Sequence, residues 1–237
     1  RVRAISGKPV GIKMVLGAYG WLSGLCEEIN RRGQESAPDF ITLDSADGGT
    51  GAAPQPLIDY MGLQIQESLP TLVDALLVYG LRDRIKVVAS GKLTTPSGVA
   101  WAMCAGADFV TSARGFMFAL GCIQALQCNT NECPSGVATH KKHLQRGLVA
   151  TDKAERVYRY ATTMHKEVGM VAHSCGVDDP RMLKRHHCRI MGANSRTIGL
   201  HEMFPPGGSF KPAIDKPDTI TDGSMGTHHG MDDVAAR

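Results

Sequence analysis

The sequence lacks long hydrophobic runs, a marked excess of either charge, and a dense cysteine framework. Its 237 residues carry a net charge of +3 with 21% charged residues, too small an imbalance to indicate a nucleic-acid-binding stripe. Apolar runs are interrupted well short of a membrane span, and no apolar segment at Arg1 resembles a signal peptide. Seven scattered cysteines argue against a disulfide scaffold and fit reduced thiols or metal ligands. These absences favour a soluble, cytoplasmic protein. The length and a hydrophobic content of 43% predict one domain plus appendages.

Short apolar runs rich in β-branched residues alternate with helical stretches along the first half of the chain. Such runs are typical of parallel strands buried on both faces. The predicted strands lie within residues 8–17, 38–44, 84–91 and 107–115. The predicted helices span 21–32, 68–79, 95–106 and 151–173, and a further helix is expected to start at Asp179 and Pro180. Glycines end the first three helices, and Thr95 before Pro96 has the chemistry of an N-cap.

The fingerprint G-x-G-x-x-G of dinucleotide-binding folds is absent after the first predicted strand, where the sequence reads LGAYGWLSG. Small-residue loops follow all four strands instead. Ligand contacts spread over the carboxyl ends of successive strands suit a barrel better than the single crevice of a doubly wound sheet. Four such units cannot close a barrel, so either the amino-terminal half lies outside this sequence or two chains complete each other.

Three cysteines lie close together in the stretch GCIQALQCNTNECPSGVATH, residues 121–140. They are Cys122, Cys128 and Cys133. Thiolates are the ligands of iron–sulfur clusters, and three of them fit a 3Fe-4S centre or a 4Fe-4S centre with one open corner. Zinc usually takes a closer cysteine pair and a fourth ligand, for which His140 or His143 could serve. Buried small hydrophobes are the third interpretation. The other cysteines are expected to be structural: Cys26, Cys104, Cys175 and Cys188.

Three further features are candidates for ligand binding. Lys13 lies in the apolar run VGIKMVL, where a charge needs a partner, either a carboxylate at the rim or a ligand. The loop DSADGGTGAAP lets backbone approach a ligand and offers Asp47 as an acceptor, although a lone glycine loop is more often a turn. Two loops combine small residues with one cation each and suit a phosphate, although either cation alone fits a solvated surface role equally well. These loops are Ser90, Gly91 and Lys92, and Ser112, Ala113, Arg114 and Gly115.

Together, the segments SADGGTGAAPQPLIDYMGLQIQESLP, GLRDRIKVVASGKLTT and GADFVTSARGFMFALGCIQALQCNTNECPSGVATH closely resemble the FMN-binding domain of glutamate synthases and its stand-alone relatives. The cysteine spacing followed by PSGVAT is the most specific element. The resemblance implies an α/β fold: the carboxyl-terminal half, strands five to eight, of a (β/α)8 TIM barrel that carries FMN and a 3Fe-4S cluster. The implied organisation is a half barrel in residues 1–150 with an iron–sulfur loop at 121–140, a helical extension at 151–191 and a Gly/Pro-rich tail at 192–237.

The resemblance also implies a role for each candidate residue. Lys13 would act at the N1 edge of the flavin, and Asp47, with Gly48 and Gly49, would line the flavin face where the imine is reduced. The loops at 90–92 and 112–115 would bind the FMN phosphate, and the three clustered cysteines would hold the 3Fe-4S cluster. The sequence departs from the family at Lys92, where paired glycines are common. It also lacks, after Lys13, the small polar residue expected near the 2-oxoglutarate carboxylate.

The implied function is that of an oxidoreductase of the CH-NH2 class, which reduces the imine of 2-oxoglutarate and ammonia to glutamate. Electrons would come from a donor such as ferredoxin or a reductase subunit. No amidotransferase domain is visible, and Arg1 cannot be the cysteine nucleophile of one, so ammonia would come from solution or from an amidotransferase subunit. Two alternatives stay open: a methylamine-linked N-methylglutamate synthase of the same family, and a non-catalytic half barrel for assembly or electron transfer.

Overall fold

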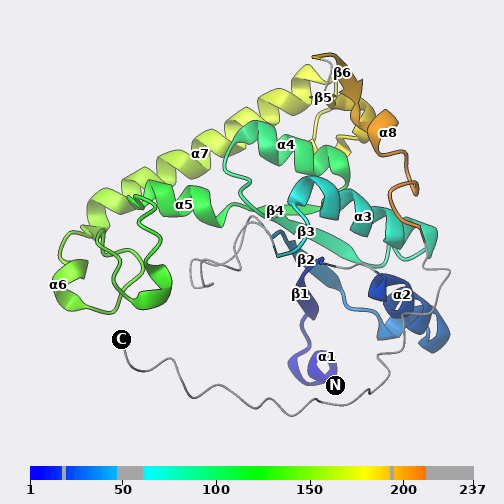
Figure 1. The fold of residues 1–237 in the computed structure, drawn as a ribbon, viewed down its shortest axis with the longest axis horizontal. Helices are drawn as coiled ribbons and strands as arrows, with labels where there is room; N and C mark the ends of the chain where they lie inside the picture. The colour runs from blue at the N-terminus through cyan, green and yellow to red at the C-terminus, as the bar shows by residue number, and fades with distance from the viewer. Residues whose placement is uncertain (18–19, 47–60, 193–194, 212–237) are drawn as a thin grey trace, which may run out of the picture.

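The centre of the fold is a parallel sheet of four strands (Figure 1). The computed structural model describes residues 1–17, 20–46, 61–192 and 195–211. The strands are β1 (Gly11–Val15), β2 (Phe40–Asp44), β3 (Lys86–Ser90) and β4 (Phe109–Thr111). Each strand pairs in parallel with the one before it, in the order β1-β2-β3-β4. The predicted parallel α/β organisation is confirmed, and among the described strands the order does not reverse as it does in a doubly wound sheet.

Three helices that follow the strands cover one face of this sheet (Figure 1). They are α2 (Trp21–Arg32), α3 (Ile65–Val78) and α4 (Pro96–Ala105). The strand residues turned toward them are fully buried: Ile41, Leu43, Val87 and Ala89. Helix α4 has the predicted ends, because the Thr95 side chain accepts a hydrogen bond from the Gly98 backbone N–H at 3.2 Å and Gly106 adopts a φ of 116°. The start of α3 was predicted three residues too late.

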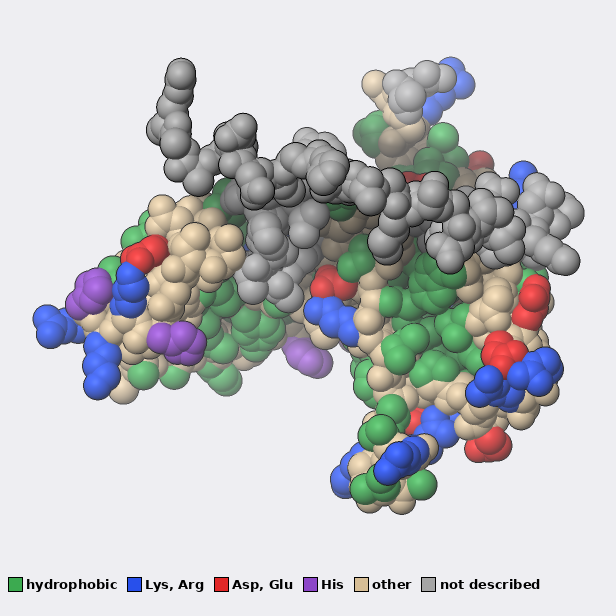
Figure 2. All heavy atoms as spheres, turned by 60° about the horizontal axis from the view of Figure 1, so that its bottom comes forward, with side chains coloured by type: hydrophobic (Ala, Val, Ile, Leu, Met, Phe, Trp, Pro, Cys, Tyr) green, Lys and Arg blue, Asp and Glu red, His purple; other side chains and the backbone are tan. Residues whose placement is uncertain are grey.

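The opposite face of the sheet keeps hydrophobic side chains in contact with solvent. Strand register puts Lys13, Thr42, Val88 and Phe109 in one row across this face. Phe109 is 57% exposed and Val15, two positions after Lys13, is 44% exposed. In Figure 2, where the lower side of Figure 1 is turned toward the viewer, hydrophobic side chains are visible over much of the surface.

A long helix, α7 (Ala150–Ser174), runs along the helical side of the molecule and packs against α4 and α5 (Ala113–Ala119) (Figure 1). Between α5 and α7 lies an irregular region that contains η3 (Cys128–Thr130) and α6 (Lys142–Gln145). The prediction of a helix at 151–173 is therefore confirmed. No helix among the described residues combines the length and apolar character needed to cross a membrane.

The segment after α7 differs from the sequence prediction. Instead of one helix from Asp179, the chain forms two 3-10 helices, η4 (Pro180–Met182) and η5 (Arg185–His187), so that prediction was wrong. Leu183 and Lys184 between them are extended. This break lets Arg185 turn inward, where it pairs with the fully buried Asp74 of α3 at 2.7 Å.

The chain then forms an antiparallel pair, β5 (Arg189–Met191) and β6 (Thr197–Gly199), and the short helix α8 (Leu200–Met203). Residues 195–211, which were predicted to belong to the Gly/Pro-rich tail, thus contain regular structure, and Leu200 and Phe210 are buried in the core. The remaining described elements are α1 (Val2–Ser6) and η1 (Gln34–Ser36).

Candidate functional site

The loops that leave β2, β3 and β4 meet at the carboxyl-terminal edge of the sheet. The backbone N–H of Ser45 donates to the carbonyl of Ser90 at 3.0 Å, and the hydroxyl of Thr111 donates to the carbonyl of Ala89 at 3.3 Å. Parallel strands end at the same edge, so residues far apart in sequence converge there. The structure therefore brings the two predicted phosphate loops together.

Lys13 and Asp44 form an ion pair on the open face of the sheet, close to this edge. The Lys13 Nζ lies 2.8 Å from Asp44 Oδ2, and the Lys13 side chain is 53% exposed whereas that of Asp44 is 10% exposed. The carboxylate is the partner that a lysine in an apolar strand requires. Because an ammonium group has three donors, Lys13 retains the capacity to contact a ligand from its exposed side.

The first phosphate loop is shaped by contact with its neighbour. Gly91 has a φ of 146°, and a Cβ at this position would lie 2.2 Å from the Ser45 Oγ. Only glycine fits there without displacing the fully buried Ser45. Lys92, next in the chain, is exposed and adopts a φ of 45°.

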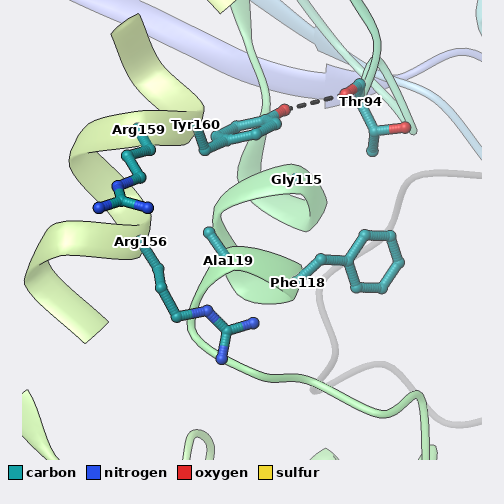
Figure 3. A pocket seen from close by; sticks show the side chains of 7 residues that line it. All are labelled: Thr94, Gly115, Phe118, Ala119, Arg156, Arg159 and Tyr160. Atoms are coloured by element: carbon teal, nitrogen blue, oxygen red, sulfur yellow. Dashed lines mark hydrogen bonds between the residues drawn. The ribbon is translucent and has the colours of Figure 1, made fainter. Parts of the chain in front are cut away.

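The second loop is held by a residue that the sequence reasoning missed, Tyr160 of α7. Its hydroxyl lies 2.7 Å from the Ser112 Oγ and donates to the Thr94 carbonyl at 3.0 Å. Figure 3 shows the Tyr160 ring reaching across toward Thr94, beside α5. Gly115 of the loop is buried and Arg114 is half-buried. Only a signal linking positions 48 residues apart would have revealed this contact, and none is visible in a single sequence.

A pocket of about 360 Å³ lies between α5 and α7 next to this contact (Figure 3). Its lining combines apolar surface with two arginines of α7, Arg156 and Arg159. Arg159 is paired with Glu155 at 2.7 Å. A second pocket, of about 510 Å³, lies at the amino-terminal ends of β3 and β4, where Arg82 pairs with Asp108 at 2.8 Å. Of the predicted site residues, Gly115 lines the first of these pockets.

The three clustered cysteines lie in the irregular region after α5. Cys133 is buried, and Cys122 and Cys128 are half-buried. Within the described parts of the chain, no group of three or more Cys, His, Asp or Glu side chains is arranged to hold a metal ion. The thiols as arranged therefore do not form a ready cluster site, and the metal assignment stays a prediction.

Cys133 differs from the other buried cysteines in that the pKa of its thiol is lowered. Burial raises the pKa of its thiol, but hydrogen bonds from the Ser135 side chain and from the backbone of Ala138, Ser135 and Val137 set the pKa below the ordinary 9.0. The Ser135 Oγ lies 3.3 Å from the Cys133 Sγ. Donors aimed at a sulfur favour its charged form, which is the form that binds metals.

The cysteines predicted to be structural behave differently. Burial raises the pKa of Cys26 to about 11 and that of Cys104 to about 12, the latter with contributions from Cys188 and Cys175. Cys104, Cys175 and Cys188, distant in sequence, pack in or against the same hydrophobic core. The raised pKa values suit inert core thiols.

Asp47, Gly48 and Gly49, predicted to line the flavin, lie outside the described residues. Their role therefore stays a prediction.

Comparison with known proteins gives the relatives of this chain. The model of the conserved region in glutamate synthase matches residues 2–178. Glutamate synthase large subunit-like protein YerD of Bacillus subtilis is 43% identical over 86% of this chain and 38% of that protein. The archaeal glutamate synthase [NADPH] of Methanocaldococcus jannaschii is 30% identical over 70% of this chain and 32% of that protein. The chain thus spans about a third of the length of these curated relatives.

Among solved structures, a mutant flavocytochrome b2 with benzoylformate is similar with a TM-score of 0.46 and 16% identity, over 77% of this chain and 35% of that one. The assignment rests instead on the sequence relatives, which cover most of the chain, including β1 to β4 and the loops at their carboxyl ends. The chain belongs to the glutamate synthase family.

Proposed function

We propose that this chain is the carboxyl-terminal half of an FMN-binding (β/α)8 barrel in an oxidoreductase that reduces the imine of 2-oxoglutarate and ammonia to glutamate. The observation that carries the proposal is the meeting of the loops after β2, β3 and β4 at one edge of a parallel sheet, beside the Lys13–Asp44 ion pair. In barrel enzymes the active site lies at this edge.

The form of the sheet supports the half-barrel proposal. Successive strands are neighbours, as they are around a barrel, and helices cover one face while the other keeps Val15 and Phe109 exposed. In a closed barrel this open face would be the packed interior. The free edges of β1 and β4 would then pair with the strands that complete the ring.

The loops at the edge fit a phosphate-bearing ligand in their chemistry. Gly91 keeps one loop close to Ser45, and Lys92 and Arg114 contribute one positive charge to each loop. FMN bound there would supply hydride transfer to the imino carbon. Lys13, held by Asp44, would place a positive charge beside the ligand and stabilise negative charge on it.

A 3Fe-4S cluster on Cys122, Cys128 and Cys133 is the further part of this proposal. Its support is the sequence spacing and the hydrogen bonds to the Cys133 thiol, which lower its pKa. Since the three side chains are not arranged as a ligand set, the cluster would require the loop to close around it. Iron analysis of anaerobically prepared protein tests this: about three irons per chain are expected from the ligand count, and none in Cys133→Ser. Zinc without iron would contradict it.

The substrate and the partners follow from the family and are proposed with it. Reducing equivalents would come from ferredoxin or from a reductase subunit, and ammonia from solution or from an amidotransferase subunit. The test is turnover of the full natural gene product with reduced flavin. Glutamate should form only when both 2-oxoglutarate and ammonia are present. Strict dependence on methylamine would favour the N-methylglutamate synthase alternative instead.

The non-catalytic alternative is favoured by one observation, the exposed hydrophobic face of the sheet. The colour and composition of the purified product decide between the two. A yellow protein with one FMN per chain supports the enzyme. A stable protein that carries no flavin and does not bind added FMN supports an assembly module.

A further inference from the structure

We infer that Tyr160 is a positioning residue, whose hydroxyl fixes the spacing of the segments that follow β3 and β4 and takes the hydrogen bond that Ser112 would otherwise donate to a phosphate. This inference rests on the proposed function. It assigns a role to a helix that was predicted to lie outside the barrel.

The direction of the hydrogen bonds carries the first step. The Tyr160 hydroxyl lies 3.0 Å from the Thr94 carbonyl oxygen, which can only accept, so the single tyrosine proton points there. The Ser112 Oγ lies 2.7 Å from the same Tyr160 oxygen. With the tyrosine proton already committed, Ser112 must be the donor in this second bond.

The consequence concerns the ligand. A phosphate dianion only accepts hydrogen bonds, and Ser112 already donates its one hydroxyl proton to Tyr160. Ser112 therefore serves as an anchor of its loop and donates no hydrogen bond to the phosphate. This narrows the role predicted for Ser112 from the sequence.

Packing supports the same arrangement. The Tyr160 ring meets the Phe116 ring edge to face, with centroids 5.0 Å apart and planes at 84°. A Cβ on Gly115 would lie 1.9 Å from the Tyr160 oxygen and 2.7 Å from the Ser112 Oγ. The loop thus needs glycine at 115 because the tyrosine hydroxyl occupies that space.

The three joined segments come from different parts of the fold. Thr94 follows β3, Ser112 follows β4, and Tyr160 belongs to α7, which packs on α4 and α5 (Figure 1). The Tyr160 hydroxyl therefore connects the segment after β3 and the segment after β4 to the same helix. Removing it leaves the strands and helices in place but frees the loops to move relative to each other.

The test uses Tyr160→Phe in the full natural gene product, with Tyr158→Phe as the control. Tyr158 is on the same helix and is 65% exposed. The dissociation constants of FMN and of riboflavin, which lacks the phosphate, are measured for each. We expect Tyr160→Phe to weaken FMN binding about tenfold, since two hydrogen bonds are lost, and to leave riboflavin binding unchanged. The control should change neither.

A second measurement needs no flavin. Amide hydrogen exchange of residues 91–95 and 112–116 should be faster in Tyr160→Phe than in the wild type, and equal to the wild type in Tyr158→Phe. If wild-type protein binds no FMN, the proposed function fails while the exchange rates still decide whether Tyr160 holds the loops. Unchanged exchange in both loops overturns the inference, and so does an equal loss of affinity for FMN and riboflavin.

Discussion

At the scale of single residues, two separate constraints favour glycine at position 91. Its φ of 146° lies where side chains are rarely found, and the space beside its Cα is filled by Ser45. The substitution Gly91→Ala therefore combines backbone strain with a steric clash, and we expect it to destabilise the protein by about 1–3 kcal/mol. Chemical denaturation with a stability probe such as circular dichroism measures the change.

The matched control is Gly24→Ala in α2, where an added Cβ would meet nothing within 4 Å. A glycine inside a helix is less favourable than alanine, so this substitution should stabilise the protein by about 0.5–1 kcal/mol. Equal effects of the two substitutions would contradict the argument about Gly91.

Cys133 should ionise more readily than the other buried thiols. Its pKa lies below 9.0, whereas that of Cys104 is raised to about 12 by burial. In chelator-treated protein, alkylation followed by mass spectrometry should give a midpoint below pH 9.0 for Cys133, with Cys104 unmodified until much higher pH. A lowered pKa also means that the ionised thiol adds stability above its unfolded pKa, which is lost as the pH falls through the folded pKa.

Ser135→Ala removes a donor to the Cys133 sulfur and should move the midpoint upward, since hydrogen bonds to the charged form lower a pKa. Ser97→Ala, at an exposed position in α4, is the control. A Cys133 midpoint at or above 9.0 in the unmodified chain would refute the prediction.

At the scale of elements, sequence reasoning succeeded where local chemistry decides the structure. Helices α2 and α4 end where predicted because Gly33 and Gly106 adopt positive φ, and the capping by Thr95 depends on neighbours only three residues away. The strands were visible because they are apolar without alternation. Local signals of this kind do not require knowledge of the tertiary fold.

Sequence reasoning failed where contacts between residues far apart in the chain determine the local structure. The residues after Asp179 have helical propensity, but the contact of Arg185 with Asp74, 111 residues earlier, draws the chain into two short turns. The contact of Tyr160 with Thr94 spans 66 residues. The grouping of Cys104, Cys175 and Cys188 is likewise a product of packing.

The Arg185–Asp74 pair should hold the carboxyl-terminal segment to α3. The Asp74 side chain is fully buried and that of Arg185 is 8% exposed. Arg185→Met leaves the carboxylate with the Ser209 backbone N–H at 2.9 Å and without a counter-charge, so we expect a loss of about 3–5 kcal/mol. Urea denaturation measures it.

A control variant and a compensating double variant test this prediction further. Arg189→Met removes an exposed arginine that lies 3.8 Å from Glu202 and donates hydrogen bonds to the side chain and carbonyl of Thr197, and it should cost only about 1 kcal/mol because these contacts are exposed to solvent. The double variant Asp74→Leu with Arg185→Met should recover most of the stability, because no buried charge remains. A single-variant loss as small as that of Arg189→Met would show that the buried pair contributes little.

At the scale of the whole molecule, the open face of the sheet sets the behaviour of the chain in isolation. A polypeptide of residues 1–237 alone should self-associate as its concentration rises, since Val15 and Phe109 remain exposed. Sedimentation velocity measures the association. Phe109→Ser should weaken it, and Met191→Ser, at a 70% exposed position on the β5–β6 pair, should not. A monomer at every concentration would show that this face needs no cover.

The order of the strands also bears on synthesis at the ribosome. Each strand from β2 to β4 pairs with the one translated just before it, so the sheet can grow as the chain emerges. The loops at its edge depend on a later part of the chain. Thr94 and Ser112 form their hydrogen bonds only with Tyr160, which is translated 48 residues after Ser112. A nascent chain that stops before α7 should form the sheet while the segments after β3 and β4 are still unconnected. If the proposed function holds, tight binding of FMN should begin only once that helix has been made.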